Sequence, residues 1–97
     1  MGEKKTYLFV YDGLIGRSEV KAILKRMPEV LLWRYDLPSC FYVVSENSAE
    51  DLARSFKAMV GDDDRRYIFS EITENHQGWL VQGSWHIINK KELLAKD

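Results

Sequence analysis

The chain has few of the residues from which disulfide frameworks and metal clusters are built. Its 97 residues include one cysteine, Cys40, and two histidines, His76 and His86. One thiol excludes an internal disulfide and any site made of several thiolates, and the two histidines do not have the spacing of a ligand pair within one helical turn. Cys40 lies in the apolar run SCFYVV, which predicts a buried core thiol, and His76 lies in the polar turn ENHQG, which predicts exposure.

Long apolar runs, internal repeats and Pro/Gly-rich linkers are also absent from a sequence with two prolines and six glycines. No apolar run approaches the ~20 residues that cross a bilayer. The N-terminal MGEKK leads into a strand-like segment and does not have the pattern of a signal peptide. We therefore expect a single domain over residues 1–97, cytoplasmic and without membrane association.

Neither sign of charge dominates, because 14 Lys and Arg residues stand against 15 Asp and Glu residues, for a net charge of −1. Such a chain has no overall field that attracts a polyanion, so contact with nucleic acid would need a local basic patch. Glycine-rich phosphate loops, a Ser/His/Asp set and a Cys/His nucleophile pattern are absent. Their absence argues against nucleotide-driven enzymes and most hydrolases.

The sequence does contain an alternation of strand-like and helix-like segments. Residues 6–11, 30–37, 39–46 and 65–73 are rich in β-branched and aromatic types, which predicts four strands, the second and third forming a hairpin.

Apolar residues recur with helical spacing in two further segments, which predicts helices near 18–28 and 48–60. Ser18 is the expected N-cap of the first helix, and Asn47 or Ser48 that of the second.

The order β-α-β-β-α-β is that of a ferredoxin-like α+β fold, in which right-handed crossovers place both helices on one face of an antiparallel sheet. The other face would be uncovered, and the chain has more large apolar side chains than two short helices bury. We therefore expect a homodimer that buries this face or the tail. The tail over residues 79–88 fits either a strand or a short helix beginning near Ser84, and its charged end, NKKELLAKD, is predicted to be a frayed helical turn.

Several short stretches together carry a family resemblance: a first strand ending in Tyr11 and Asp12, the hairpin WRYDLPSCFYVV, the strand GDDDRRYIFSEI, and a tail with GWL and Trp85. They resemble the SinR-like family of small bacterial proteins. That family is similar to the small CRISPR-associated ferredoxin-like nuclease subunit and to related toxin-like endoribonucleases. The resemblance runs from Tyr7 to about Asn89 and implies that Asp12 of two subunits shares Mg²⁺ or Mn²⁺ and activates water for phosphodiester cleavage.

The residues themselves leave two roles open for Asp12. An Asp followed by Gly13 at the end of a strand fits a turn in which the carboxylate accepts backbone N–H groups. No second carboxylate follows at a spacing that builds a metal site within one chain, so a metal role requires the dimer. The acidic run Asp62–Asp64 lacks the spaced ligands of a calcium loop and is predicted to be a solvated turn.

Arg17, Lys21 and Lys25 recur at i+4 spacing and line one flank of the first predicted helix, close to Asp12. Such a stripe is able to contact phosphates, and it is also the ordinary wet face of an amphipathic helix.

The three tryptophans, Trp33, Trp79 and Trp85, are expected to seal the core or a dimer contact rather than stack on bases.

The sequence leaves two classes of function open. One is a non-catalytic dimeric module that binds nucleic acid or protein, and the other is a metal-dependent endonuclease that uses Asp12 from both subunits.

Overall fold

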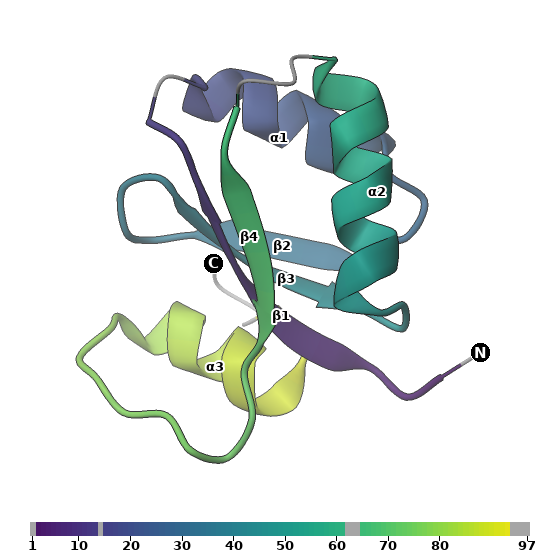
Figure 1. Ribbon diagram of the computed structural model, residues 1–97. Coiled ribbons are helices and arrows are strands. Elements are labelled where there is room, and N and C mark those ends of the chain that lie inside the picture. Colours follow the sequence, from purple (N-terminus) through teal and green to yellow (C-terminus); the bar gives the residue numbers. More distant parts are fainter. Residues whose placement is uncertain (1, 14, 62–64, 94–97) are drawn as a thin grey trace.

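The computed structural model describes residues 2–13, 15–61 and 65–93. Its elements are, in chain order, β1 (Lys5–Tyr11), α1 (Arg17–Arg26), β2 (Leu32–Tyr35), β3 (Cys40–Ser45), α2 (Ala49–Val60), β4 (Tyr67–Glu71) and α3 (Gln82–Lys90). The strands form one antiparallel sheet in the order β2-β3-β1-β4, with α1 and α2 on one face (Figure 1). The predicted ferredoxin-like α+β fold is confirmed. The predicted turn at Asp62–Asp64 lies outside the described residues.

A large core fills the space between the sheet and the helices α1 and α2. Phe9 of β1 lies at its centre, fully buried, and its ring contacts those of Tyr11, Phe56, Tyr67 and Phe69. Period-two alternation along β1 and β3 sends every second side chain into this core and the others to the opposite face. Because both faces are covered over β3, all six residues of this strand are buried.

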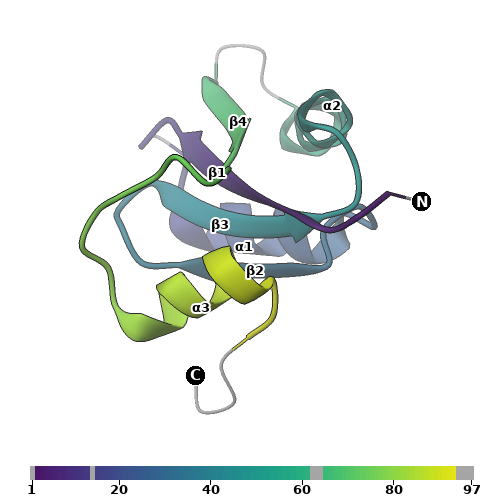
Figure 2. The same ribbon diagram turned by 90° about the horizontal axis from the view of Figure 1, so that it is seen from below.

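The opposite face carries a smaller core, which α3 covers (Figure 2). Ile87 and Ile88 of α3 pack with Cys40, Tyr42 and Val44 of β3. The expectation of an uncovered face is therefore wrong over this part of the sheet. Of the two alternatives predicted for the tail, strand or helix, the structure has the helix, which begins at Gln82 and ends at Lys90.

Hydrogen bonds attach both ends of α3 to the sheet. Near its start, the Ser84 hydroxyl donates to the Asp36 carboxylate at 2.8 Å and accepts from Nε of Arg34 at 3.1 Å. Near its end, the buried Thr6 hydroxyl lies 3.4 Å from the carbonyl oxygens of both Ile87 and Ile88. α3 is thus an integral part of the fold. None of the helices in the described ranges has the length and apolar character of a bilayer span.

The start of α1 differs from the prediction. Its N-cap is Gly16, without a side-chain cap, and not Ser18. The reason is the turn before it, in which the Ile15 N–H donates to the Asp12 carbonyl, so that the chain enters helical geometry directly after Gly16. α1 also ends at Arg26, two residues earlier than expected. Of the frayed helical turn predicted for residues 89–97, Asn89 and Lys90 belong to α3, residues 91–93 are non-helical, and residues 94–97 lie outside the described residues.

α2 is capped at both ends. Of the two predicted caps, Asn47 and Ser48, it is Ser48 that caps the helix, since its hydroxyl accepts a hydrogen bond from the Asp51 N–H at 3.1 Å. Gly61 follows the last turn with a left-handed φ of 69°, a conformation that glycine adopts without a steric penalty.

Candidate functional site

The basic stripe on α1 lies against aromatic rings of β2. The Arg17 guanidinium carbon is 4.4 Å from the centroid of the Tyr35 ring. The Lys21 ammonium is 5.7 Å from the Tyr35 centroid and 5.8 Å from that of Trp33, and both are cation–π distances. Lys25 continues the stripe as an exposed residue. We call these five residues the basic–aromatic edge.

β2 is an outer strand of the sheet, so this edge is accessible. Trp33 packs partly against the large core, and Tyr35 is 38% exposed. Glu29, which the sequence places near the stripe, is turned toward α2, where it accepts a hydrogen bond from the Ser55 hydroxyl at 3.0 Å. The positive charge of the edge is therefore not neutralised by Glu29.

Asp12 follows β1 directly and builds the turn into α1. Its N–H donates to the Arg66 carbonyl at 2.8 Å, and its carbonyl accepts from the Ile15 N–H at 2.9 Å. Asp12 is half-buried and lies a few residues before Arg17 in the same connection. Within the described ranges, no three His, Cys, Asp or Glu side chains gather closely enough to hold a metal ion.

Cys40 is buried beneath α3, as its apolar sequence context predicts. Burial, with a smaller contribution from Asp36, raises the pKa of its thiol to about 11. The thiol is therefore protonated at neutral pH, and a reactive thiolate is disfavoured.

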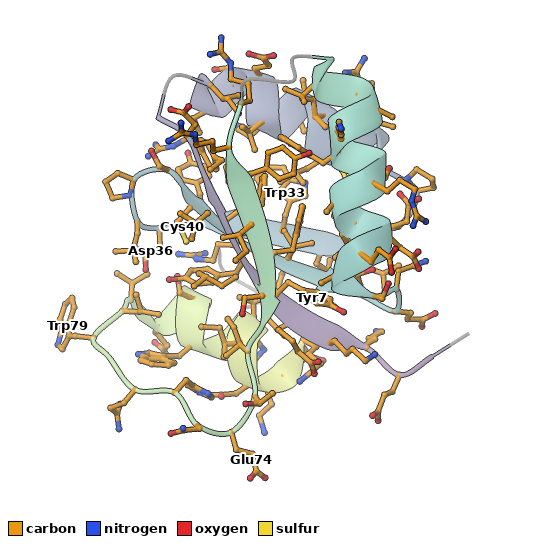
Figure 3. All side chains as sticks on the ribbon, in the orientation of Figure 1. Tyr7, Trp33, Asp36, Cys40, Glu74 and Trp79 are labelled. Atoms are coloured by element: carbon orange, nitrogen blue, oxygen red, sulfur yellow. The ribbon has the colours of Figure 1, made fainter. Side chains whose placement is uncertain are left out.

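The three tryptophans differ in burial. Trp33 packs against the large core and Trp85 against the small one, as expected. Trp79, by contrast, is 87% exposed and points away from the body of the molecule (Figure 3). Of its two predicted roles, sealing the core is therefore excluded, and a dimer contact stays a prediction.

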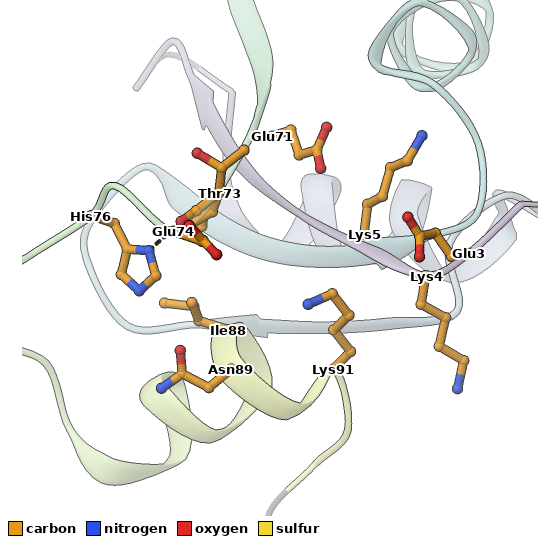
Figure 4. Close-up of a pocket in the computed structure, with 11 residues that line it drawn as sticks. Glu3, Lys4, Lys5, Glu71, Thr73, Glu74, His76, Ile88, Asn89 and Lys91 are labelled. Carbon is orange, nitrogen blue, oxygen red and sulfur yellow. Dashed lines mark hydrogen bonds between the residues drawn. The ribbon is translucent and has the colours of Figure 1, made fainter.

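A polar groove of about 410 Å³ lies between the residues at the start of β1, the end of β4 and the end of α3 (Figure 4). Its charged lining consists of three lysines and three glutamates, namely Lys4, Lys5, Lys91, Glu3, Glu71 and Glu74. Because these charges cancel and are spread over an open surface, the groove selects neither anions nor cations. His76 lies at its end and is exposed as predicted, with Nδ1–H donating to the Thr73 carbonyl.

An apolar pocket of about 320 Å³ adjoins this groove and shares Ile72, His76 and Ile88 with it. Sequence reasoning missed this pocket. Much of its wall comes from residues 76–80, a segment without helix or strand. Such a segment has no periodicity from which its position can be inferred. Within this segment, the local signal that could have indicated a binding surface is Trp79, a large exposed apolar side chain.

Comparisons of this chain with family models, with curated proteins and with solved structures find no match. The SinR-like resemblance thus stays a prediction, and the function is inferred from the geometry of the residues described.

Proposed function

We propose that this protein is a small, non-catalytic module that binds single-stranded nucleic acid through the basic–aromatic edge. One observation carries the proposal: cations of α1 lie directly against the rings of β2. Arg17 and Lys21 would contact phosphates, and in turning toward them would uncover the ring faces of Tyr35 and Trp33, on which unpaired bases would stack.

The rings favour single strands over duplexes. A base stacks on a side chain only when its own face is free, whereas a duplex would reach the cations alone. Because the net charge of the chain is −1, affinity has to come from the edge itself and not from a global field. Binding should therefore be sensitive to salt and to the removal of a few specific charges.

The proposal predicts how binding depends on salt. Three phosphate contacts give a slope of log K against log salt of about −2 for a single strand. Replacing Arg17, Lys21 and Lys25 together with Gln should flatten this slope toward zero and weaken binding by about tenfold or more at low salt. Fluorescence anisotropy with a labelled oligouridylate at several KCl concentrations measures both quantities.

A matched variant distinguishes the contribution of the basic–aromatic edge to binding from the contribution of net charge. Replacing the exposed residues Lys4, Lys57 and Lys90 with Gln removes the same charge from other surfaces. This variant should bind like the unmodified protein. Equal weakening by both triple variants, or no binding at low salt, would contradict the proposal.

We further infer a homodimer formed through the part of the sheet face that α3 does not cover. Val10 of β1 and Ile68 of β4 are paired across the two strands and are 39% and 60% exposed. Neighbouring apolar side chains on a sheet face are typical of self-association. Asp12 lies two residues after Val10, so strand alternation predicts the same face, and a two-fold axis through this patch would bring the two Asp12 side chains together.

That placement favours a second candidate function, a metal-dependent endonuclease in which Asp12 of both subunits holds Mg²⁺ or Mn²⁺. A single Asp12 is too few ligands for a protein-bound ion, so the site would exist only in the dimer.

A cleavage assay decides between the two functions. The non-catalytic module is expected to leave labelled RNA and duplex DNA intact with Mg²⁺ or Mn²⁺. The endonuclease would instead require cleavage that depends on metal and is lost in Asp12→Asn, which keeps the shape of the side chain but removes its charge. Sedimentation velocity provides the control, since Asp12→Asn should leave the dimer intact while Ile68→Glu should dissociate it.

A further inference from the structure

The apolar pocket lies on the sheet face opposite α1 and α2, and its walls come from three parts of the chain. Leu8 and Tyr42 form its floor on the sheet, Trp85 and Ile88 contribute from α3, and the segment that carries His76 closes it. Its volume of about 320 Å³ falls in the range of small-molecule sites.

Tyr42 brings a polar group to the buried part of this mostly apolar surface, whereas the polar groups of His76, Gln77 and Trp79 belong to exposed residues. Tyr42 is 2% exposed, and its hydroxyl makes no hydrogen bond with any residue of the described ranges. No fully enclosed side-chain oxygen or nitrogen in those ranges lacks a partner, so the Tyr42 hydroxyl must keep a small opening. Tyr42 is one of the residues that line this pocket.

The Tyr42 hydroxyl is a hydrogen-bond donor at neutral pH. Burial, followed by the proximity of Cys40 and Asp36, raises its pKa to about 12, while Arg34 acts in the opposite direction. A donor in such a nearly enclosed position has few available partners, and a ligand with an acceptor atom would supply one.

Aromatic rings shape the rest of the site. The His76 ring stacks on Trp85 with centroids 5.9 Å apart and an interplanar angle of 27°. The hydrogen bond from Nδ1 of His76 to the Thr73 carbonyl holds this ring in place. Trp79 lies at the rim of the pocket with its ring pointing outward, so it adds no wall. The flat rings of His76 and Trp85 favour a planar ligand.

The scarcity of polar groups limits which ligands fit. The edges of a nucleobase carry several donors and acceptors, most of which would lose their hydrogen bonds to water here without replacement. A charged ligand would be desolvated without a counter-ion in the pocket. A mostly apolar ring system with one acceptor matches the one side-chain donor of the lining that is buried, the Tyr42 hydroxyl.

We propose that this pocket binds a flat aromatic small molecule carrying one hydrogen-bond acceptor, to which the Tyr42 hydroxyl donates. The pocket is separate from the basic–aromatic edge, so this site does not depend on nucleic-acid binding.

A matched pair of probes tests the proposal. Quinoline and naphthalene have nearly the same shape, but only quinoline carries an acceptor nitrogen. In an NMR titration, both should shift amide signals of residues 76–80 and of Tyr42 and Trp85, and quinoline should bind about fivefold more tightly because of one added neutral hydrogen bond.

Two tyrosine variants isolate the hydrogen bond. Tyr42→Phe should remove the preference for quinoline and leave the affinity for naphthalene unchanged, because the ring is retained. Tyr7→Phe is the control, since the Tyr7 hydroxyl donates to the Asn47 carbonyl at 2.6 Å in the other core, and it should keep the fivefold preference. Absence of localised shifts with either probe, or an unchanged preference in folded Tyr42→Phe, would overturn the proposal. The shift map of the unmodified protein decides the matter even if Tyr42→Phe does not fold.

Discussion

Replacing Phe9 with Ala is expected to lower the free energy of unfolding by about 3–5 kcal/mol. Phe9 is fully buried at the centre of the large core. Its ring stacks on Phe69 with centroids 4.2 Å apart and meets the edge of Phe56 at 4.9 Å. Truncation leaves a cavity between β1, β4 and α2 that these rigid rings cannot close. Since small domains are stable by only about 5–15 kcal/mol, the variant should be marginally folded at 25 °C.

Urea denaturation followed by circular dichroism measures this loss. Leu31→Ala is the control, because it also removes a large apolar side chain, but from a position that is 46% exposed and lies outside the proposed dimer contact. Its expected effect is within about 0.5 kcal/mol. A loss below about 1 kcal/mol for Phe9→Ala would mean that β1 does not run through the middle of the core.

The fold was predictable because its signals are local and periodic. The alternation of Tyr7, Phe9 and Tyr11 with smaller residues, and the recurrence of Leu52 and Phe56 in α2, hold within short windows of sequence. The cap at Ser48 is equally local. The start of α1 was mispredicted because Gly16 has no side chain to signal a cap, and the Asp12–Ile15 backbone bond that sets the start depends on the conformation of the turn.

The candidate surfaces were predictable only in part. Their i+4 spacing shows that Arg17 and Lys21 share a flank of α1, but it says nothing about what that flank meets. Only the packing of α1 beside the outer strand β2 brings these cations to Tyr35 and Trp33. Helix propensity was likewise unable to place α3, since its position depends on side-chain hydrogen bonds to distant residues such as Thr6.

α3 is held on the sheet by these hydrogen bonds and by the small core. We expect one substitution in that core to release the helix. Ile87 is fully buried in the small core. Ile87→Asp would place an unpaired carboxylate there, and the helix should detach rather than bury the charge. The large core lies on the other face of the sheet and does not involve α3, so the sheet, α1 and α2 should remain folded.

Cys40 reports this release directly. In the native protein its thiol is covered by α3, and burial raises its pKa to about 11. At pH 8, below that pKa, the thiol is almost entirely protonated, whereas an exposed cysteine has an ordinary pKa near 8.5 and a substantial thiolate fraction. Since the thiolate is the reactive form, Ile87→Asp should speed the labelling of Cys40 by Ellman's reagent by about 100-fold or more.

Asn89→Asp supplies the control for this experiment, because it adds the same carboxylate to the exposed side of the same helix. Its labelling rate should match that of the unmodified protein, and a faster rate would indicate general fraying of α3 rather than loss of its buried contact. Continued protection of Cys40 in Ile87→Asp would contradict the prediction, because the thiol would then be covered by something other than α3. With release of the helix, the apolar pocket loses the wall formed by Trp85 and Ile88, so quinoline binding should disappear in the same variant.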